Sequence, residues 1–215
     1  MNRLRIQFLL VNTLILGWHA SIHGAVTGQW DFNSSNLTAT VGTALAYRGD
    51  TAGQTTFTTR TIAGETAVVM AFPATTPTQG YVMTHGIAPN GGGSAVNQFT
   101  LIMDVIYPAA SANQYRALLQ TSTGNANDAD LFVGDGNGIG TIAVYHGTVQ
   151  PDTWHRLAFV FDLTLPNGQL RKFIDGNLVG VQDLTSGVDG RWSLDPTALL
   201  FTDDDGETKP GFVNS

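Results

Sequence analysis

The feature that most constrains this chain is the spacing of its apolar residues. Beyond residue 26, apolar residues nowhere keep the 3.6-residue period of a helix for more than about two turns. Short runs of β-branched and aromatic residues recur instead, each bounded by Gly, Asn, Asp or Pro. This pattern predicts an all-β domain. We expect strands at residues 28–32, 55–59, 67–72, 80–84, 98–107, 116–121, 130–133, 141–145, 154–162, 170–174, 178–183 and 198–203.

In two of these runs the residues at both odd and even positions are largely apolar, as is typical of central strands. Residues 98–107 and 154–162 both contain consecutive apolar side chains that face opposite sides of a sheet. The number of expected strands is larger than one small barrel holds, which favours two packed sheets. The pair Asp175-Gly176 between apolar runs predicts a tight hairpin, because both central positions of a type I′ turn need a positive φ. No linker divides the chain into domains.

The N-terminus has the pattern of a secretory signal peptide. Arg3 and Arg5 precede an apolar run at residues 6–18, and small residues follow as far as Ala25, after which we place the cleavage. The apolar run is shorter than the roughly 20 residues that a spanning helix needs, although a retained anchor is the alternative. We therefore expect residues 1–25 to be removed and residues 26–215 to be secreted or held in the cell envelope.

Charge and cysteine content narrow the classes of function. Ten Lys and Arg against seventeen Asp and Glu give a net charge of −7, so neither a nucleic-acid binder nor a polybasic membrane-binding surface is expected. The absence of cysteine excludes disulfides, a thiol nucleophile and a thiolate metal site.

Several motifs occur in an order that resembles a known family. They are Trp30-Asp31-Phe32, Phe99-Thr100-Leu101, the strand from Trp154 to Asp162, and Ile174-Asp175-Gly176. Their order and spacing resemble the laminin G-like modules of the concanavalin A-like lectin/glucanase superfamily. The resemblance covers residues 28–215, and it implies an antiparallel two-sheet jelly-roll sandwich.

The end of the chain departs from that family pattern. Such modules usually finish with a further strand after a segment like residues 211–215, where this sequence ends. We therefore expect the last strand to be missing and the domain to be C-terminally incomplete, as in a fragment of a longer exported protein. An unpaired sheet edge would then invite self-association with another chain.

Two acidic clusters have the composition of a calcium site. Carboxylates close together around a glycine turn suit Ca²⁺, and the resemblance adds that laminin G-like modules often hold one calcium ion. A solvated acidic turn is the alternative. The predicted metal ligands are Asp203, Asp205 and Glu207, with Asp31 as a distant partner, and a second, weaker cluster comprises Asn125, Asn127, Asp128 and Asp130.

Catalysis finds little support in the sequence. The superfamily's glucanases carry alternating Glu-x-Asp-x-(x)-Glu in one strand, whereas this chain has only Glu65 and Glu207, far apart. No Gly-x-Ser-x-Gly elbow and no paired histidine motif occurs. We expect no enzymatic activity in this domain.

Three residues are candidates for ligand contact. Trp192 and Tyr115 follow polar segments and are predicted to be exposed rings on which a sugar could stack, with Arg191 as a hydrogen-bonding neighbour. Core packing of the rings and a surface Arg–Asp pair are the alternative interpretations.

The sequence thus favours a secreted, non-catalytic module that binds a glycan or an extracellular protein surface and is stabilised by calcium. Two alternatives remain open. One is an accessory module of a larger exported hydrolase whose catalytic domain lies outside this chain, and the other is a structural adhesion module of the cell envelope.

Overall fold

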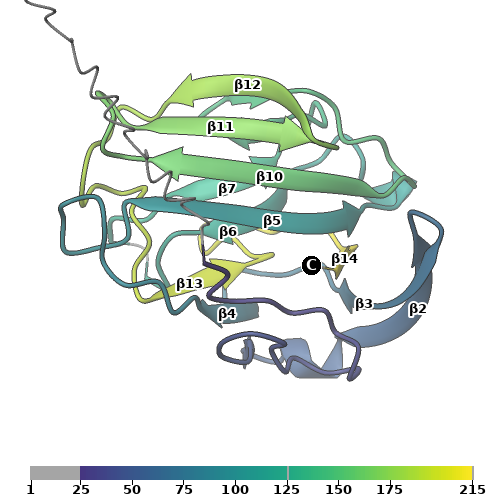
Figure 1. Ribbon diagram of the computed structural model, residues 1–215. Coiled ribbons are helices and arrows are strands. Elements are labelled where there is room, and N and C mark those ends of the chain that lie inside the picture. Colours follow the sequence, from purple (N-terminus) through teal and green to yellow (C-terminus); the bar gives the residue numbers. More distant parts are fainter. Residues whose placement is uncertain (1–24, 125, 215) are drawn as a thin grey trace, which may run out of the picture.

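The chain folds into two antiparallel β-sheets packed face to face. A computed structural model describes residues 25–124 and 126–214. In Figure 1, strands of the second sheet lie in front of β6 and β7 of the first. Sheet 1 has the order β1 (Ala46–Arg48), β4 (Gly80–Thr84), β13 (Thr197–Leu200), β6 (Arg116–Gln120), β7 (Asp130–Val133), β8 (Ile139–Thr141) and β9 (Val144–His146). Sheet 2 has the order β12 (Asn177–Asp183), β11 (Gln169–Ile174), β10 (His155–Asp162), β5 (Gln98–Ile106), β14 (Gly211–Asn214), β3 (Glu65–Phe72) and β2 (Thr56–Ile62).

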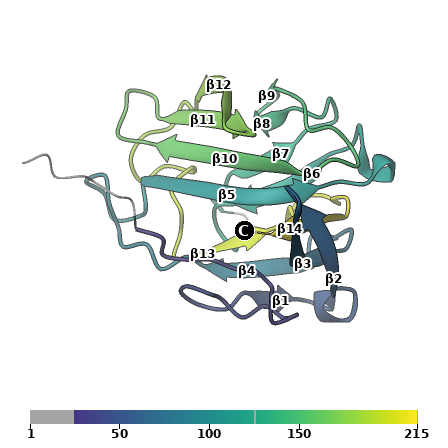
Figure 2. The same ribbon diagram turned by 45° about the vertical axis from the view of Figure 1, so that its right-hand side comes forward.

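This architecture confirms the expected all-β, two-sheet sandwich. Two short 3₁₀ helices, η1 (Thr51–Gly53) and η2 (Ala109–Ser111), interrupt the strands. The two long apolar runs are the paired central strands β5 and β10, in register from Gln98↔Asp162 to Val105↔His155. Their inward side chains form the middle of the core, where the Phe99 and Phe161 rings stack with centroids 4.4 Å apart. Figure 2 shows both sheets curving around this shared interior.

The hairpin between β11 and β12 confirms the predicted turn. Asp175 and Gly176 both have positive φ, at 52° and 79°. The Asp175 carboxylate also accepts the backbone N–H of Arg156 at 2.9 Å, which ties the turn to the neighbouring strand.

The single strand expected at residues 141–145 is instead two short strands. β8 and β9 are joined by Ile142 and Ala143, which take the positive φ values of a tight turn (46° and 59°). Neither residue is one of the usual turn residues, so the sequence gives no sign of this hairpin. β1 and β14 were likewise not expected.

The C-terminal segment corrects the expectation of an open edge at this end of the chain. Residues 211–214 are themselves a strand, β14, which pairs with β5 on one side and β3 on the other. Asn214 donates from its side chain to the backbone oxygens of Asp31 and Val68. The edges of sheet 2 are β12 and β2, so no edge is left unpaired at β14.

Near the N-terminus, the strand expected at residues 28–32 is reduced to one β-bridge between Gln29 and Val41. Trp30 and Phe32 are nevertheless buried in the core. The predicted signal peptide lies outside the described residues, apart from Ala25. Among residues 25–124 and 126–214, no helix has the length and apolar character needed to span a bilayer.

Candidate functional site

The two acidic clusters, separate in the sequence, meet at one place in the fold. Asp130 begins β7, and Asp128 precedes it in the connecting loop, whereas Asp203, Asp204 and Asp205 follow β13. Carboxylate oxygens of the latter three lie within 4.8 Å of one another. The charges of Asp203 and Asp204 contribute to raising the pKa of Asp130, so the two clusters lie near each other, although Asp128 and Asp130 are outside the set within 4.8 Å. We call these five residues the acidic site.

Gln120 holds the two halves of the acidic site together. This residue at the end of β6 is fully buried and pairs with Asp130 across the sheet. Its Oε1 accepts the backbone N–H of Asp204 at 3.0 Å. The loop after β13 is therefore fixed beside the start of β7.

Thr121 fixes the second wall of the site. Its hydroxyl donates to the carbonyl of Arg191 at 2.8 Å and accepts the N–H of Ala129 at 2.9 Å. Arg191 in turn donates from Nε to the carbonyl of Asp128 at 2.7 Å. The basic side chain next to the acidic site is thus held in place through a backbone oxygen.

The acidic site holds more negative charge than its surroundings compensate. Burial, followed by the nearby charges of Asp203, Asp128 and Asp204, raises the pKa of Asp130 to about 7. Burial also raises the pKa of Asp128 and of Asp203, while Arg191 lowers the pKa of Asp128 and Asp130 only in part. Close carboxylates in a partly buried site make proton or cation binding favourable.

Two oxygen atoms of the acidic site are buried without a hydrogen-bond donor. Oδ1 of Asp130 and Oδ1 of Asp204 are both shielded from solvent and lack a partner among the described residues. Buried carboxylate oxygens normally accept hydrogen bonds or bind a cation. Asp203, Asp204 and Asp205 bring carboxylate oxygens within 4.8 Å of one another, and oxygen is the type of donor that Ca²⁺ takes.

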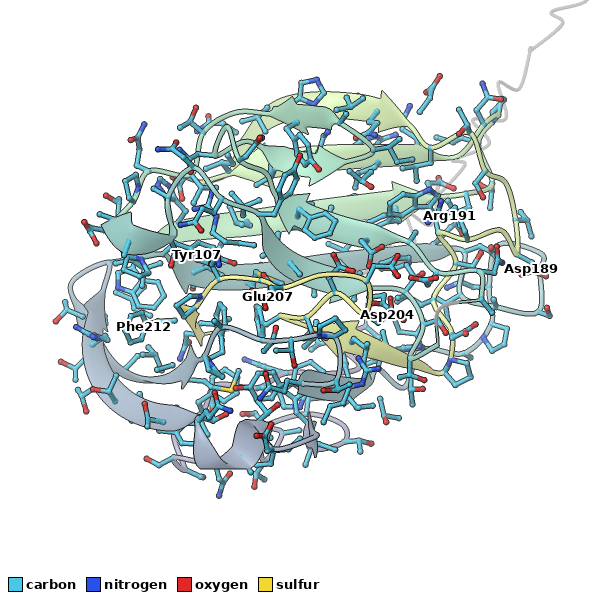
Figure 3. All side chains as sticks on the ribbon, turned by 180° about the vertical axis from the view of Figure 1, so that it is seen from behind. Tyr107, Asp189, Arg191, Asp204, Glu207 and Phe212 are labelled. Carbon is cyan, nitrogen blue, oxygen red and sulfur yellow. The ribbon has the colours of Figure 1, made fainter. Side chains whose placement is uncertain are left out.

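The predicted metal ligands are only partly brought together. Asp203 and Asp205 lie in the acidic site, but Glu207 is exposed and outside the group, and Figure 3 places it away from Asp204, toward the middle of the molecule. Asp31 is also outside the group. Its pKa is lowered by hydrogen bonds from Thr40 and Asn33, so its carboxylate already has donors. Asp204, which the sequence analysis did not choose as a ligand, lies in the group with Asp203 and Asp205.

Trp192 is not a ligand-binding ring, contrary to the sequence-based expectation. Its side chain is 1% exposed and stacks on Phe161 at 6.1 Å between ring centroids. The physical reason is the preceding turn, which Asp189 anchors by accepting the backbone N–H groups of Ser94 and Ala95. This anchored loop directs the indole into the space between the sheets.

Tyr115 is exposed, as predicted, and belongs to an aromatic group on the outer face of sheet 1. Its ring, 45% exposed, makes edge-to-face contacts with Phe132 of β7 at 5.7 Å and Tyr145 of β9 at 6.1 Å. A Cβ atom on Gly134 would lie 3.1 Å from the Tyr145 ring. The glycine-rich segment after β7 therefore lets this ring lie close to the backbone.

Strand β7 connects the aromatic group to the acidic site. Burial alternates along it, so Asp130 and Phe132 share the outward face while their neighbours point into the core. Residues two apart on a strand are separated by about 7 Å. The outward face of β7 therefore carries an aromatic ring and a carboxylate of the acidic site.

A His–Asp pair elsewhere, with a buried histidine and an exposed aspartate, has the first elements of a catalytic triad but not its geometry. His155 Nδ1 lies 2.7 Å from Asp175 Oδ2, while its Nε2 accepts the backbone N–H of Gln150 at 3.0 Å. A general base needs that nitrogen free to take a proton from a nucleophile. The pair therefore anchors β10 to the β11–β12 turn.

Comparisons with known proteins identify no family. No family model matches the chain, and no curated protein matches it. Among solved structures, the chain is similar to domain 4 of AbnA, a GH43 extracellular arabinanase from Geobacillus stearothermophilus, in complex with arabinotriose. The two share 16% identity at a TM-score of 0.46, over 88% of this chain and 91% of that chain.

Proposed function

We propose that this chain is an exported, non-catalytic binding module of the laminin G-like kind, in which the acidic site binds calcium and the neighbouring aromatic group binds a glycan. The observation that carries the proposal is the convergence of five carboxylates with two buried, unpartnered oxygens at Asp130 and Asp204. A divalent cation would compensate that charge and supply the missing partner of both atoms.

The calcium ligands in this proposal are Asp130, Asp203, Asp204 and Asp205. The ion would join the loop after β13 to the start of β7, which are otherwise linked through Gln120. Because it would bind the folded chain alone, it would stabilise the domain and order the loops around it.

A glycan is the ligand that the aromatic group favours. Exposed rings give apolar contact to the flat face of a sugar, and Tyr115 is held in a fixed orientation by Phe132 and Tyr145. The calcium ion would lie about 7 Å along β7, where vicinal hydroxyls of the same glycan could complete its coordination. An extracellular protein surface is the alternative ligand.

Thermal unfolding tests the calcium site. The chain is melted in EDTA and again with calcium added back, for the wild type and for Asp204→Asn and Asp130→Asn. At about a hundredfold excess of calcium over its dissociation constant, the wild type should be stabilised by about 2.7 kcal/mol, which for a domain of this size raises the melting temperature by roughly 5–10 °C. The two variants should lose this response.

Asp183→Asn, an exposed carboxylate on β12, is the matched control and should keep the full calcium response. If the melting temperature of the wild type does not respond to calcium, the proposed calcium site is wrong.

Glycan binding is then measured on a polysaccharide panel with and without calcium, and Tyr115→Ala should abolish it. Binding that Tyr115→Ala leaves intact would place the ligand elsewhere.

The two other functions considered from the sequence lead to different observations. An accessory module of an exported hydrolase would bind the polysaccharide that its enzyme cleaves, so the panel above would also identify that substrate. A structural module would bind no soluble sugar and would self-associate instead.

A further inference from the structure

The free edge of β2 is the least protected strand edge among the described residues. β2 is seven residues long, is the last strand of sheet 2 and pairs only with β3. Figures 1 and 2 place it at the margin of the molecule. Most of the hairpin end, residues 59–66, is exposed. Its sequence, TFTTRTI, has one charged residue and no proline, and no register shift interrupts its pairing with β3.

The other three edges are protected in ways that β2 is not. β1 and β9 are only three residues long. β12 has a register shift opposite Lys172 and Phe173, and it packs against β9, where the His146 ring lies against Gly180. Short strands, bulges and covering segments are the usual protection against edge-to-edge pairing.

The turn at Ala63 and Gly64 determines which backbone groups of β2 are free. Their φ values of 50° and 90° belong to a two-residue type I′ hairpin, in which the flanking residues Ile62 and Glu65 exchange hydrogen bonds. Hydrogen-bonded pairs alternate along an antiparallel ladder. Ile62, Arg60, Thr58 and Thr56 therefore direct their N–H and C=O groups to β3, whereas Thr61, Thr59 and Phe57 direct theirs outward.

We propose that this edge pairs antiparallel with the same edge of a second copy, about a two-fold axis at Thr59. In that register Thr59 faces Thr59 of the second copy, and Phe57 faces Thr61, so all outward backbone groups pair. Arg60, the one charged residue, faces Thr58 and not another arginine, which avoids the penalty for like charges directly opposite. The edge is self-complementary, and the two copies form one continuous sheet of twice the width.

This inference does not depend on calcium or on glycan binding, since β2 is remote in the chain from both groups and belongs to the other sheet. It also moves the self-association expected from the sequence to a different edge. The C-terminal strand β14 is paired on both sides. In this proposal the free edge that pairs with a second copy is that of β2.

The mass of the purified full chain in solution is the first test. Light scattering across a concentration series should give twice the 22.9 kDa chain mass, falling toward the single mass on dilution. Thr59→Pro should give the single mass at every concentration with an unchanged circular dichroism spectrum, because it removes an N–H that has no partner within the copy. Val181→Lys, on the exposed face of β12, is the control and should stay dimeric.

A wild-type chain that remains monomeric throughout overturns the proposal, as does a Thr59→Pro variant that still dimerises. If Thr59→Pro fails to fold, Thr59→Lys decides, because it places two positive charges opposite each other at the axis. Loss of the dimer in Val181→Lys but not in Thr59→Lys would assign the interface to the exposed face of sheet 2. The proposal that the copies pair through the edge of β2 would then be wrong.

The register is tested with single cysteines, since the chain has none of its own. Hydrogen-bonded pairs place Cα atoms about 5.5 Å apart, within the range of a disulfide. Thr59→Cys should form a covalent dimer under mild oxidation, whereas Thr61→Cys, opposite Phe57, should not. Equal cross-linking of the two variants would overturn the two-fold axis at Thr59.

Discussion

Trp192 and Tyr115 both follow polar segments, yet they have opposite roles. The difference arises from what holds the preceding loop. The turn before Trp192 is fastened by Asp189 to the segment at Ser94, which directs the ring into the core. Tyr115 precedes β6 and rests on neighbouring rings at the surface. Anchoring of this kind depends on residues about a hundred positions away, so the sequence around each ring could not distinguish them.

These roles predict opposite mutational effects. Trp192→Ala should lower the free energy of unfolding by about 3–5 kcal/mol, because it leaves a cavity between the sheets. Tyr115→Ala should change it by less than about 1 kcal/mol while abolishing glycan binding. Urea denaturation of both variants, with the glycan assay, measures this. A large loss of stability in Tyr115→Ala would mean that the ring is structural.

Lys172 is a second residue whose environment the sequence did not reveal. It is fully buried, and its Nζ donates to the carbonyl of Val144 at 2.9 Å and to Oε1 of Gln182 at 2.8 Å. Burial lowers its pKa from 10.5 to about 8. Between these two pH values the unfolded chain keeps a proton that the folded chain has released, so this residue's contribution to stability rises with pH in that window and is unfavourable below it.

The comparison with Lys172→Met isolates this effect. The free energy of unfolding of the wild type minus that of the variant should increase by about 1–3 kcal/mol from pH 7 to pH 10. Denaturant titrations at intervals of one pH unit provide the measurement. The hydrogen bonds lost in the variant contribute a constant offset and not a slope. A difference that is flat with pH would show that the folded-state pKa of Lys172 is not lowered.

At the scale of elements, the strands with clear boundaries were predicted well. β7 has the predicted bounds, and β5 and β10 differ from the prediction by one residue, since turn residues and apolar alternation mark them locally. β8, β9 and β14 were not resolved from the sequence. β8 and β9 have three residues each and are joined by a turn that lacks the usual turn residues, whereas β14 pairs with β3 and β5, which are distant in the chain. Local propensity carries little information for such short strands.

Gly211 shows how β14 is adapted to its position between β5 and β3. A Cβ atom there would lie 2.8 Å from both the Phe72 and Tyr107 rings. Gly211→Ala should therefore destabilise the domain by about 1–3 kcal/mol through overpacking. Gly136→Ala, where a Cβ would have open space, is the control and should be neutral or slightly stabilising. Thermal melts of both variants give the comparison, and equal melting temperatures would contradict this packing.

At the scale of the whole molecule, the acidic site is produced by the sandwich and not by either sequence cluster alone. The sequence identified Asp203 and Asp205 and, separately, Asp128 and Asp130. Their convergence requires β6 to lie between β13 and β7, an arrangement set by long-range pairing. The same arrangement separates Glu207 from the group, although it is only two residues from Asp205 in the chain.

Direct calorimetric titration of the purified chain with calcium tests whether the acidic site binds the ion. We expect saturable binding of one calcium ion per chain, abolished by Asp204→Asn and retained by Asp183→Asn. The absence of saturable calcium binding by the folded wild-type chain would contradict it and would leave the five carboxylates as a proton-binding acidic loop.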